Sequence, residues 1–157
     1  MIHKWTSRES NADFSTASRA QEPLYYEPDK AYKKGLFLFV MAEKENCVFC
    51  RIATGEIKTE KVYENDNFLA FPDAHPRVEG HTLVIPKNHF ANILDMPASM
   101  GEELIDAVKN VAEIRLRQGA TGFNLIQNNF PDAGQIVMHA HFHLIPRRKG
   151  DGINFAG

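Results

Sequence analysis

Our expectations for the rest of the chain depend on one stretch, Val137-Met138-His139-Ala140-His141-Phe142-His143-Leu144-Ile145. It is rich in β-branched and apolar residues and is followed by Pro146, a combination that predicts a β-strand. Side chains alternate between the two faces of a strand, so the three histidines should share one face at intervals of about 6.8 Å. The other face is expected to be apolar, with Met138, Ala140, Phe142 and Leu144.

Three evenly spaced histidines are more typical of a functional site than of a strand with one solvent-exposed face, because buried titratable rings need partners. A neutral imidazole can act as a nucleophile, a general base or a metal ligand. Two of these rings could bind one zinc ion, or one ring could attack phosphorus and give a covalent intermediate. The spacing alone leaves both uses open.

The composition is ordinary for a soluble globular protein and predicts one main domain. The chain has 157 residues, of which 43% are hydrophobic and 24% charged, and its formal net charge is −2. This charge gives no general attraction to nucleic acid or to an anionic membrane, so a phosphate-bearing ligand must be held by local donors. No apolar run approaches the roughly 20 residues that span a bilayer.

The two cysteines, Cys47 and Cys50, form a Cys-x-x-Cys motif and cannot build a disulfide framework. Such a motif indicates metal binding or redox chemistry in a reducing compartment, and we expect a cytoplasmic protein. A Cys₂His₂ zinc site would take two further ligands, for which His89 and one histidine of the strand are candidates. Reduced structural thiols are an alternative. A redox motif is less favoured because no strand precedes Cys47.

The first 45 residues differ from the rest and are expected to be an extension that is disordered or loosely docked, with the domain at 46–157. They contain few aliphatic residues before Leu36 and are rich in Ser, Thr, Arg and Glu. Residues 36–40 could add an edge strand or cover a groove. The domain could also begin at Met41.

The remaining sequence predicts an α+β domain with a mostly antiparallel sheet of about five strands, one long helix and a short N-terminal helix. The short helix should follow Cys47 and stop at Gly55. Strand-like runs occupy 61–64, 67–71, 81–85 and 122–127, besides the histidine strand. The long helix should begin at a Ser99-x-x-Glu102 capping box and stop at Gly119.

Other polar residues are ambiguous when taken singly. His3 and His75 are expected to be exposed, and His81 could be a core residue or a site residue. Short polar side chains in loops next to the site strands are more often turn formers than ligand contacts; these are Asp73, Asn128 and Gln135. The basic run at 147–149 is expected to be a solvated strand end.

Together, these residues resemble the histidine triad family of nucleotide hydrolases and transferases, whose signature is His-φ-His-φ-His-φ-φ with φ apolar. The stretch from His139 to Ile145 fits this signature at every position. The likeness extends from Cys47 to about Asp151 and includes Gly-His-Thr-Leu-Val-Ile-Pro-Lys-Asn-His at 80–89 and Ala-Gly-Gln at 133–135. The resemblance implies the fold of that family for this region.

The resemblance also implies a mechanism in which His141 attacks the α-phosphorus of a nucleotide derivative and water resolves the nucleotidyl-histidine. His143 would contact phosphate oxygens, His81 would support the cluster, and the carbonyl of His139 would orient the ring of His141. The implied nucleotide-binding residues are Asp73 at the ribose hydroxyls, Asn128 and Gln135 at the phosphate or leaving group, and His141 and His143.

Zinc-bearing members of that family imply a specific ligand set here: Cys47, Cys50, His89 and His139. In this assignment a structural zinc takes the first histidine of the triad and leaves the second free to attack. The family resemblance thus separates two uses of histidine that the spacing alone left open.

Two residues depart from the family pattern. Ile136 occupies a position where several members have Ser or Thr, so a hydroxyl near the leaving group is absent. Phe130 stands where a glycine is common, which could reshape the phosphate approach. Both departures concern the leaving group rather than the nucleophile.

We therefore expect a purine nucleoside phosphoramidase or nucleotidyl hydrolase that acts on AMP or GMP derivatives. The alternatives are a dinucleoside polyphosphate hydrolase, a hydrolase in which zinc activates water, and a non-catalytic nucleotide-binding or interaction protein. The resemblance also implies a homodimer, with the helix at 99–118 and the neighbouring strand as the interface. No nucleic acid or membrane partner is expected.

Overall fold

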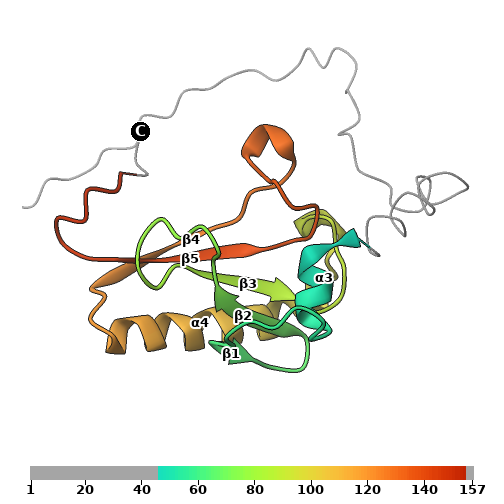
Figure 1. Ribbon diagram of the computed structural model, residues 1–157, viewed down its shortest axis with the longest axis horizontal. Helices are drawn as coiled ribbons and strands as arrows, with labels where there is room; N and C mark the ends of the chain where they lie inside the picture. The colour runs from blue at the N-terminus through green and yellow to red at the C-terminus, as the bar shows by residue number, and fades with distance from the viewer. Residues whose placement is uncertain (1–45, 155–157) are drawn as a thin grey trace, which may run out of the picture.

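The computed structural model of the protein describes residues 46–154, and Figure 1 shows a sheet with one long helix lying along one face. The extension predicted at 1–45, the possible strand at 36–40 and His3 lie outside the described residues. Within the described part, no helix is both long enough and apolar enough to cross a membrane.

The fold is α+β, as predicted, with five antiparallel strands in the order β1-β2-β3-β5-β4. The strands are β1 Tyr63–Glu64, β2 Phe68–Pro72, β3 Thr82–Pro86, β4 Gly122–Ile126 and β5 Phe142–Arg147. The α-helices are α3 Val48–Ala53 and α4 Gly101–Arg117. Three 3₁₀ turns, η1 Ile93–Asp95, η2 Ala98–Met100 and η3 Pro131–Ala133, lie in the connections.

The main core lies between α4 and one face of the sheet. Helix α4 buries an apolar stripe that consists of Ala107, Val108, Val111 and Ala112. It packs against inward-facing residues of three strands: Phe68, Ala70, Val84, Phe142 and Leu144. Full burial of a large apolar side chain contributes about 1.5–3 kcal/mol to stability, so this layer fixes which face of β5 is apolar.

The opposite face of the sheet is covered in part by α3. Phe49 and the two cysteines pack with Leu69, Phe71, Leu83 and Ile85 in a second cluster. Cys47 is the N-cap of α3, and its sulfur accepts from the N–H of Cys50. The short helix predicted after Cys47 is therefore present, and it lies on the face of the sheet that α4 leaves uncovered.

Strands β1 and β2 form a hairpin, and the side chain of Asn65 stabilises its turn. Its side-chain oxygen accepts from the N–H groups of Asn67 (3.2 Å) and Phe68 (2.7 Å). An Asx turn of this kind fixes the reversal without a residue of positive φ. Strands β1 and β2 then pair with Tyr63 opposite Ala70.

The predicted histidine strand is shifted toward its C-terminal end, because β5 begins at Phe142 and runs through Pro146 to Arg147. Of the three histidines, only His143 is in the strand. The N–H of Ala140 donates to the carbonyl of Phe90 (2.6 Å), so this part of the chain is bonded to the loop after β3. Pro146 is tolerated because β5 pairs with β3 only as far as Leu144.

The predicted capping box at Ser99 is wrong. Helix α4 begins at Gly101 after Met100, without a side-chain cap, and Ser99 belongs to the 3₁₀ turn η2. A capping box is instead formed at η1, where Asn92 accepts from Leu94 and Asp95 accepts from Asn92. The predicted stop at Gly119 is correct, because Gly119 follows the helix with φ of 94°.

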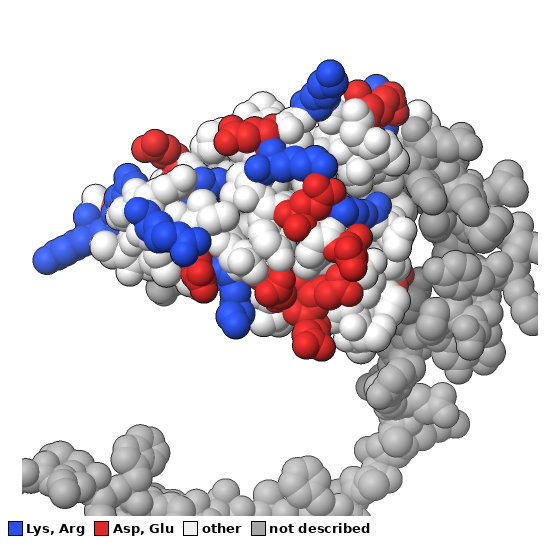
Figure 2. All heavy atoms as spheres, turned by 90° about the horizontal axis from the view of Figure 1, so that it is seen from below, with Lys and Arg blue, Asp and Glu red and all other residues white. Residues whose placement is uncertain are grey.

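The face that carries α4 has mixed charge. Figure 2 looks at the molecule from this side and shows acidic side chains gathered in one region, with Lys and Arg scattered elsewhere. The acidic residues that line a hollow at the start of α4 are Asp66, Glu102, Glu103 and Asp106. The described residues on this face form no broad basic patch, in keeping with the small negative net charge.

Candidate functional site

The three triad histidines lie on the sheet face opposite α4 and differ in how far they are buried. His139 is completely buried, His141 is 5% exposed, and the side chain of His143 is 19% exposed. The rings of His141 and His143 are 4.9 Å apart, edge to face. The structure thus brings the predicted site residues together at the start of β5, with accessibility increasing from the first histidine to the third.

The ring of His141 is held by the backbone of the segment that leads into β5. Its Nδ1 is 2.8 Å from the carbonyl oxygen of His139, which can only accept, so Nδ1 carries the hydrogen. The neutral ring therefore has its lone pair on Nε2. The edge of Phe49 packs against the ring at a centroid distance of 5.3 Å and fixes its plane.

His81 and His143 form a chain of hydrogen bonds that begins at the backbone. The N–H of Arg77 donates to Nδ1 of His81 (3.2 Å), and Nε2 of His81 is 3.0 Å from Nδ1 of His143. If His81 is neutral, its Nε2–H donates to His143, and the hydrogen of His143 is then on Nε2. Because Nδ1 of His143 accepts from His81, the Nε2–H of His143 is available as a hydrogen-bond donor.

Burial keeps these histidines neutral. Desolvation lowers the pKa of His143 to about 4, and the neighbouring His141 and His81 act in the same direction. Burial also lowers the pKa of His81, against the opposing effect of the Asp73 carboxylate. The rings of His81 and His143 are therefore neutral near pH 7.

Asp73 follows β2 directly and faces both histidines. Its Oδ2 is 3.5 Å from Nδ1 of His81 and 3.7 Å from Nδ1 of His143. Its Oδ1 accepts from the N–H of His75 (2.9 Å) in an Asx turn. The predicted ribose-binding residue is thus beside the triad, while the side chain of His75 is exposed as expected.

The candidate metal centre is formed by the four predicted metal ligands, whose donor atoms all lie within 4.8 Å of one another: Cys47, Cys50, His89 and His139. Nδ1 of His139 is 3.4 Å from the sulfur of Cys47 and 3.5 Å from that of Cys50. Nδ1 of His89 is 3.2 Å from the sulfur of Cys50. Zinc bond lengths of about 2.3 Å to sulfur and 2.0–2.1 Å to nitrogen imply separations of about 3.5 Å in a tetrahedron.

His139 is oriented for such a role. Its Nε2 is 2.9 Å from the carbonyl oxygen of Pro86, so Nε2 carries the hydrogen and Nδ1 points its lone pair at the two sulfurs. Burial lowers the pKa of His139 to about 4, so the ring is neutral without a metal. A backbone carbonyl that fixes the tautomer of a ligand histidine is common at metal sites. The donor set and the tautomer both fit zinc.

Gln135 is buried, and its side chain bonds to the backbone of the loop between β4 and β5 and of the loop after β3. Its Oε1 accepts from the N–H of Phe130 (2.8 Å), and its Nε2 donates to the carbonyls of Ala91 (2.5 Å) and Val137 (3.0 Å). A contact between this amide and a nucleotide would therefore compete with these bonds. The predicted partner, Asn128, lies beside Gly134 in the same loop.

One residue of the site region, Phe49, was not singled out by the sequence. Phe49 lies between the two cysteines on α3 and contacts the rings of both His139 and His141, a position that only the Cys-x-x-Cys spacing hinted at. Arg147 was expected to be a solvated strand end. Instead it donates to the carboxylate of Asp151 (2.7 and 2.8 Å) and to the side chain of Asn124 (2.6 Å).

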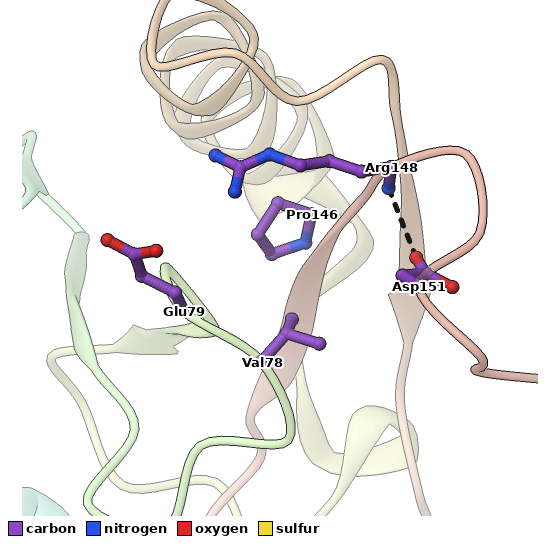
Figure 3. Close-up of a pocket in the computed structure, with 5 residues that line it drawn as sticks. All are labelled: Val78, Glu79, Pro146, Arg148 and Asp151. Atoms are coloured by element: carbon purple, nitrogen blue, oxygen red, sulfur yellow. Dashed lines mark hydrogen bonds between the residues drawn. The ribbon is translucent and has the colours of Figure 1, made fainter.

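A separate hollow lies at the other end of β5. Figure 3 shows Glu79 and Arg148 on opposite sides of it, and Asp151 accepting from the backbone N–H of Arg148 (3.1 Å). The remaining lining residues are Val78 and Pro146. No predicted site residue lines this hollow, so we place the candidate site at the triad.

Comparison with known proteins assigns most of the described region to one family. The HIT domain family model matches residues 54–150. An uncharacterised HIT-like protein of Methanocaldococcus jannaschii is 46% identical over 106 residues, which are 68% of this chain and 82% of that protein. An adenosine 5'-monophosphoramidase of Candida albicans is 37% identical over 113 residues, 69% of this chain and 74% of that protein.

A solved structure supports the same family assignment. A zinc-bound histidine triad family protein from Mycobacterium smegmatis superimposes with a TM-score of 0.66 at 36% identity, covering 71% of this chain and 82% of that chain. The family model, the curated relatives and the fold all coincide on the segment that contains the triad. The chain therefore belongs to the HIT domain family, the histidine triad proteins.

Proposed function

We propose that this protein hydrolyses a purine nucleoside phosphoramidate and releases the nucleoside monophosphate through a nucleotidyl-histidine on His141. The observation that carries the proposal is the state of the His141 ring, whose Nδ1 is bound to the His139 carbonyl while Nε2 keeps its lone pair. A relative named as an adenosine 5'-monophosphoramidase supports a phosphorus–nitrogen bond and adenosine as the nucleoside.

In the proposed first step, Nε2 of His141 forms a bond to the α-phosphorus and the bond from phosphorus to the amine nitrogen breaks. The amine takes a proton from the solvent as it leaves. The phosphorylated imidazole carries a positive charge, which the carbonyl of His139 stabilises through Nδ1–H. Water then attacks phosphorus and releases a proton to the solvent, the bond to Nε2 breaks, and the nucleoside monophosphate departs.

His143 supplies a donor to the phosphate in this scheme. The chain from Arg77 through His81 directs the hydrogen of His143 to Nε2, where it can bond to a phosphate oxygen on which charge develops. Because burial holds the pKa of His143 near 4, this donor is a neutral N–H across the physiological range. We assign ribose binding to Asp73 and a phosphate contact to Asn128.

We propose zinc as a structural ion held by Cys47, Cys50, His89 and His139, because their donor separations match a tetrahedral site. When bound, zinc would tie α3 to the loop after β3 and to the segment before β5, as a closed four-ligand site does. The two free thiols favour a reducing compartment, which supports the predicted cytoplasmic location.

We also propose a homodimer that uses strand β4 and the adjoining end of α4. Strand β4 is at the edge of the sheet, and its outward apolar residues Phe123 and Leu125 are 43% and 45% exposed. Leu116 of α4 is 42% exposed. An open edge with exposed apolar side chains favours pairing with another strand, and a second copy offers the same edge.

The test is nucleoside monophosphate release from adenosine phosphoramidate by the wild-type protein and by His141→Ala, with zinc content measured on the same samples. We expect turnover in the wild type only and equal zinc in both proteins. Turnover retained in His141→Ala would contradict the assigned nucleophile. Nucleotide binding without turnover in either protein would instead indicate a binding protein.

A further inference from the structure

Cys47 and Cys50 are placed so that their sulfurs can form a bond with little movement. Cys47 is the N-cap of α3, Cys50 lies in its first turn, and the N–H of Cys50 donates to the sulfur of Cys47 (3.5 Å). Both sulfurs also lie close to one atom, Nδ1 of His139, at 3.4 and 3.5 Å. Residues three apart on a helix have Cβ atoms about 5–6 Å apart, and a disulfide needs about 3.5–4.5 Å. A shift of about 1–2 Å at the N-cap therefore allows the bond.

The two thiols are within reach of a small oxidant. Cys47 is 7% exposed and Cys50 is 8% exposed. His89, whose Nδ1 is 3.2 Å from the sulfur of Cys50, is only half-buried. Hydrogen peroxide is little larger than water, so it needs no wide opening to reach them. The chain contains only two cysteines, so no third thiol of the same chain competes for either sulfur.

We infer that Cys47 and Cys50 are an oxidation site, at which a hydroperoxide forms a reversible disulfide and displaces the metal ion. One thiolate attacks a peroxide oxygen, the O–O bond breaks and hydroxide leaves, which gives a sulfenic acid. The second thiolate attacks that sulfur, an S–S bond forms and a second hydroxide leaves. The two sulfurs together lose two electrons, and hydrogen peroxide is reduced to water with protons from the solvent.

The disulfide empties the candidate metal centre because it removes two of the four donors. Zinc binds thiolates, and the two remaining imidazoles, of His89 and His139, do not make a closed site. Loss of zinc releases the Nδ1 side of His139, and a displacement of this residue moves the carbonyl that accepts from Nδ1 of His141. This consequence rests on the proposed function: the oxidised protein should lose turnover and regain it after reduction and addition of zinc.

The test treats the zinc-loaded protein with hydrogen peroxide and measures released zinc with a chromogenic chelator. We expect about one zinc ion released for each pair of thiols lost, as a single four-ligand site requires. Peptide mapping by mass spectrometry should find the Cys47–Cys50 disulfide, and dithiothreitol should restore zinc binding. Thiols that stay reduced, or zinc released without a disulfide, would overturn the inference. If the purified protein binds no zinc, the proposed structural ion is wrong, and the disulfide alone decides whether the oxidation site exists.

Two variants separate this site from other effects of peroxide. Cys50→His keeps four zinc donors, one thiolate and three imidazoles, but has no second thiol for a disulfide. We expect it to retain its zinc over the time in which the wild type releases its ion. Met138→Leu is the matched control, because Met138 is an oxidisable residue next to His139, and it should release zinc as the wild type does. Equal release by Cys50→His and the wild type would contradict the inference, and if Cys50→His binds no zinc, the wild-type disulfide and its reversal decide.

Discussion

His139 connects the candidate metal centre to the candidate nucleophile through two different groups of one residue. Its ring nitrogen Nδ1 faces the sulfurs of Cys47 and Cys50, and its backbone carbonyl accepts from Nδ1 of His141. A displacement of the His139 ring would move the carbonyl that sets the tautomer of His141. The first histidine of the triad thus positions the second.

Phe130 has a backbone conformation that favours glycine, with φ of 68° and ψ of 158°. Such a conformation costs a non-glycine residue about 1–3 kcal/mol. We predict that Phe130→Gly raises the free energy of unfolding by about 1 kcal/mol, because relief of strain exceeds the added entropy of the unfolded chain. Urea denaturation of the two proteins measures this difference.

Lys109→Gly is the control, because Lys109 is exposed on helix α4 with φ in the ordinary range. It should lose about 1 kcal/mol of stability, since glycine weakens a helix. A loss of stability in Phe130→Gly as large as that in Lys109→Gly would show that no strain is stored at Phe130.

Stability should fall as the pH decreases from about 6.5 to about 4. Burial lowers the folded-state pKa of His143 to about 4, so in this window the unfolded chain binds a proton that the folded chain does not. The contribution of His143 is complete above pH 6.5 and is lost as the pH approaches 4. His139 acts in the same direction.

Thermal unfolding between pH 4 and 7, without free metal, checks this dependence. His143→Gln should reduce the decrease in Tm, and His75→Gln, which changes an exposed histidine, should not. The same pH dependence in His143→Gln and in the wild type would mean that His143 titrates normally in the folded protein.

Sequence reasoning identified the titratable residues of the site but not how their neighbours hold them. The spacing of the triad and of Cys47 and Cys50 marked residues that the structure does bring together. The family resemblance assigned Gln135 to the phosphate or leaving group, and the structure adds that its amide bonds to three backbone groups of its own surroundings. Such bonds depend on the course of a loop that no local pattern specifies.

At the scale of elements, the buried face of the sheet was predicted better than the residues at which β5 and α4 begin. The alternation in β5 gave the correct sheet face, because Phe142 and Leu144 belong to the core. The start of β5 was wrong because Ala140 bonds to the Phe90 loop. The Ser99 cap was wrong because the chain enters α4 through a 3₁₀ turn, which sequence similarity to a capping box cannot reveal.

Helix α3 should depend on the metal more than any other element, because Cys50 lies within its six residues and Cys47 is its N-cap. We predict that Cys50→Ser abolishes stoichiometric zinc and lowers Tm by more than 5 °C, since structural zinc contributes directly to folding. Metal analysis and calorimetry measure both effects. Thr54→Ser, just beyond α3, serves as the control, and an unchanged Tm in Cys50→Ser would contradict a structural ion.

At the scale of the whole molecule, the proposed dimer would extend the sheet across β4. We predict that Leu125→Asp gives a monomer in analytical ultracentrifugation, because the charge would be buried without a partner at the interface. Leu94→Asp, at a leucine 59% exposed on η1, should leave the mass unchanged. A monomeric wild type would contradict the proposed interface.

The covalent role of His141 is the central claim, and the stereochemical outcome at phosphorus tests it most directly. The measurement uses an adenosine phosphoramidate made chiral at the α-phosphorus by sulfur, hydrolysed in isotopically labelled water. Attack by His141 followed by attack of water inverts the phosphorus twice, so our account predicts net retention. Net inversion would show that water attacks the substrate directly, and it would contradict the nucleotidyl-histidine.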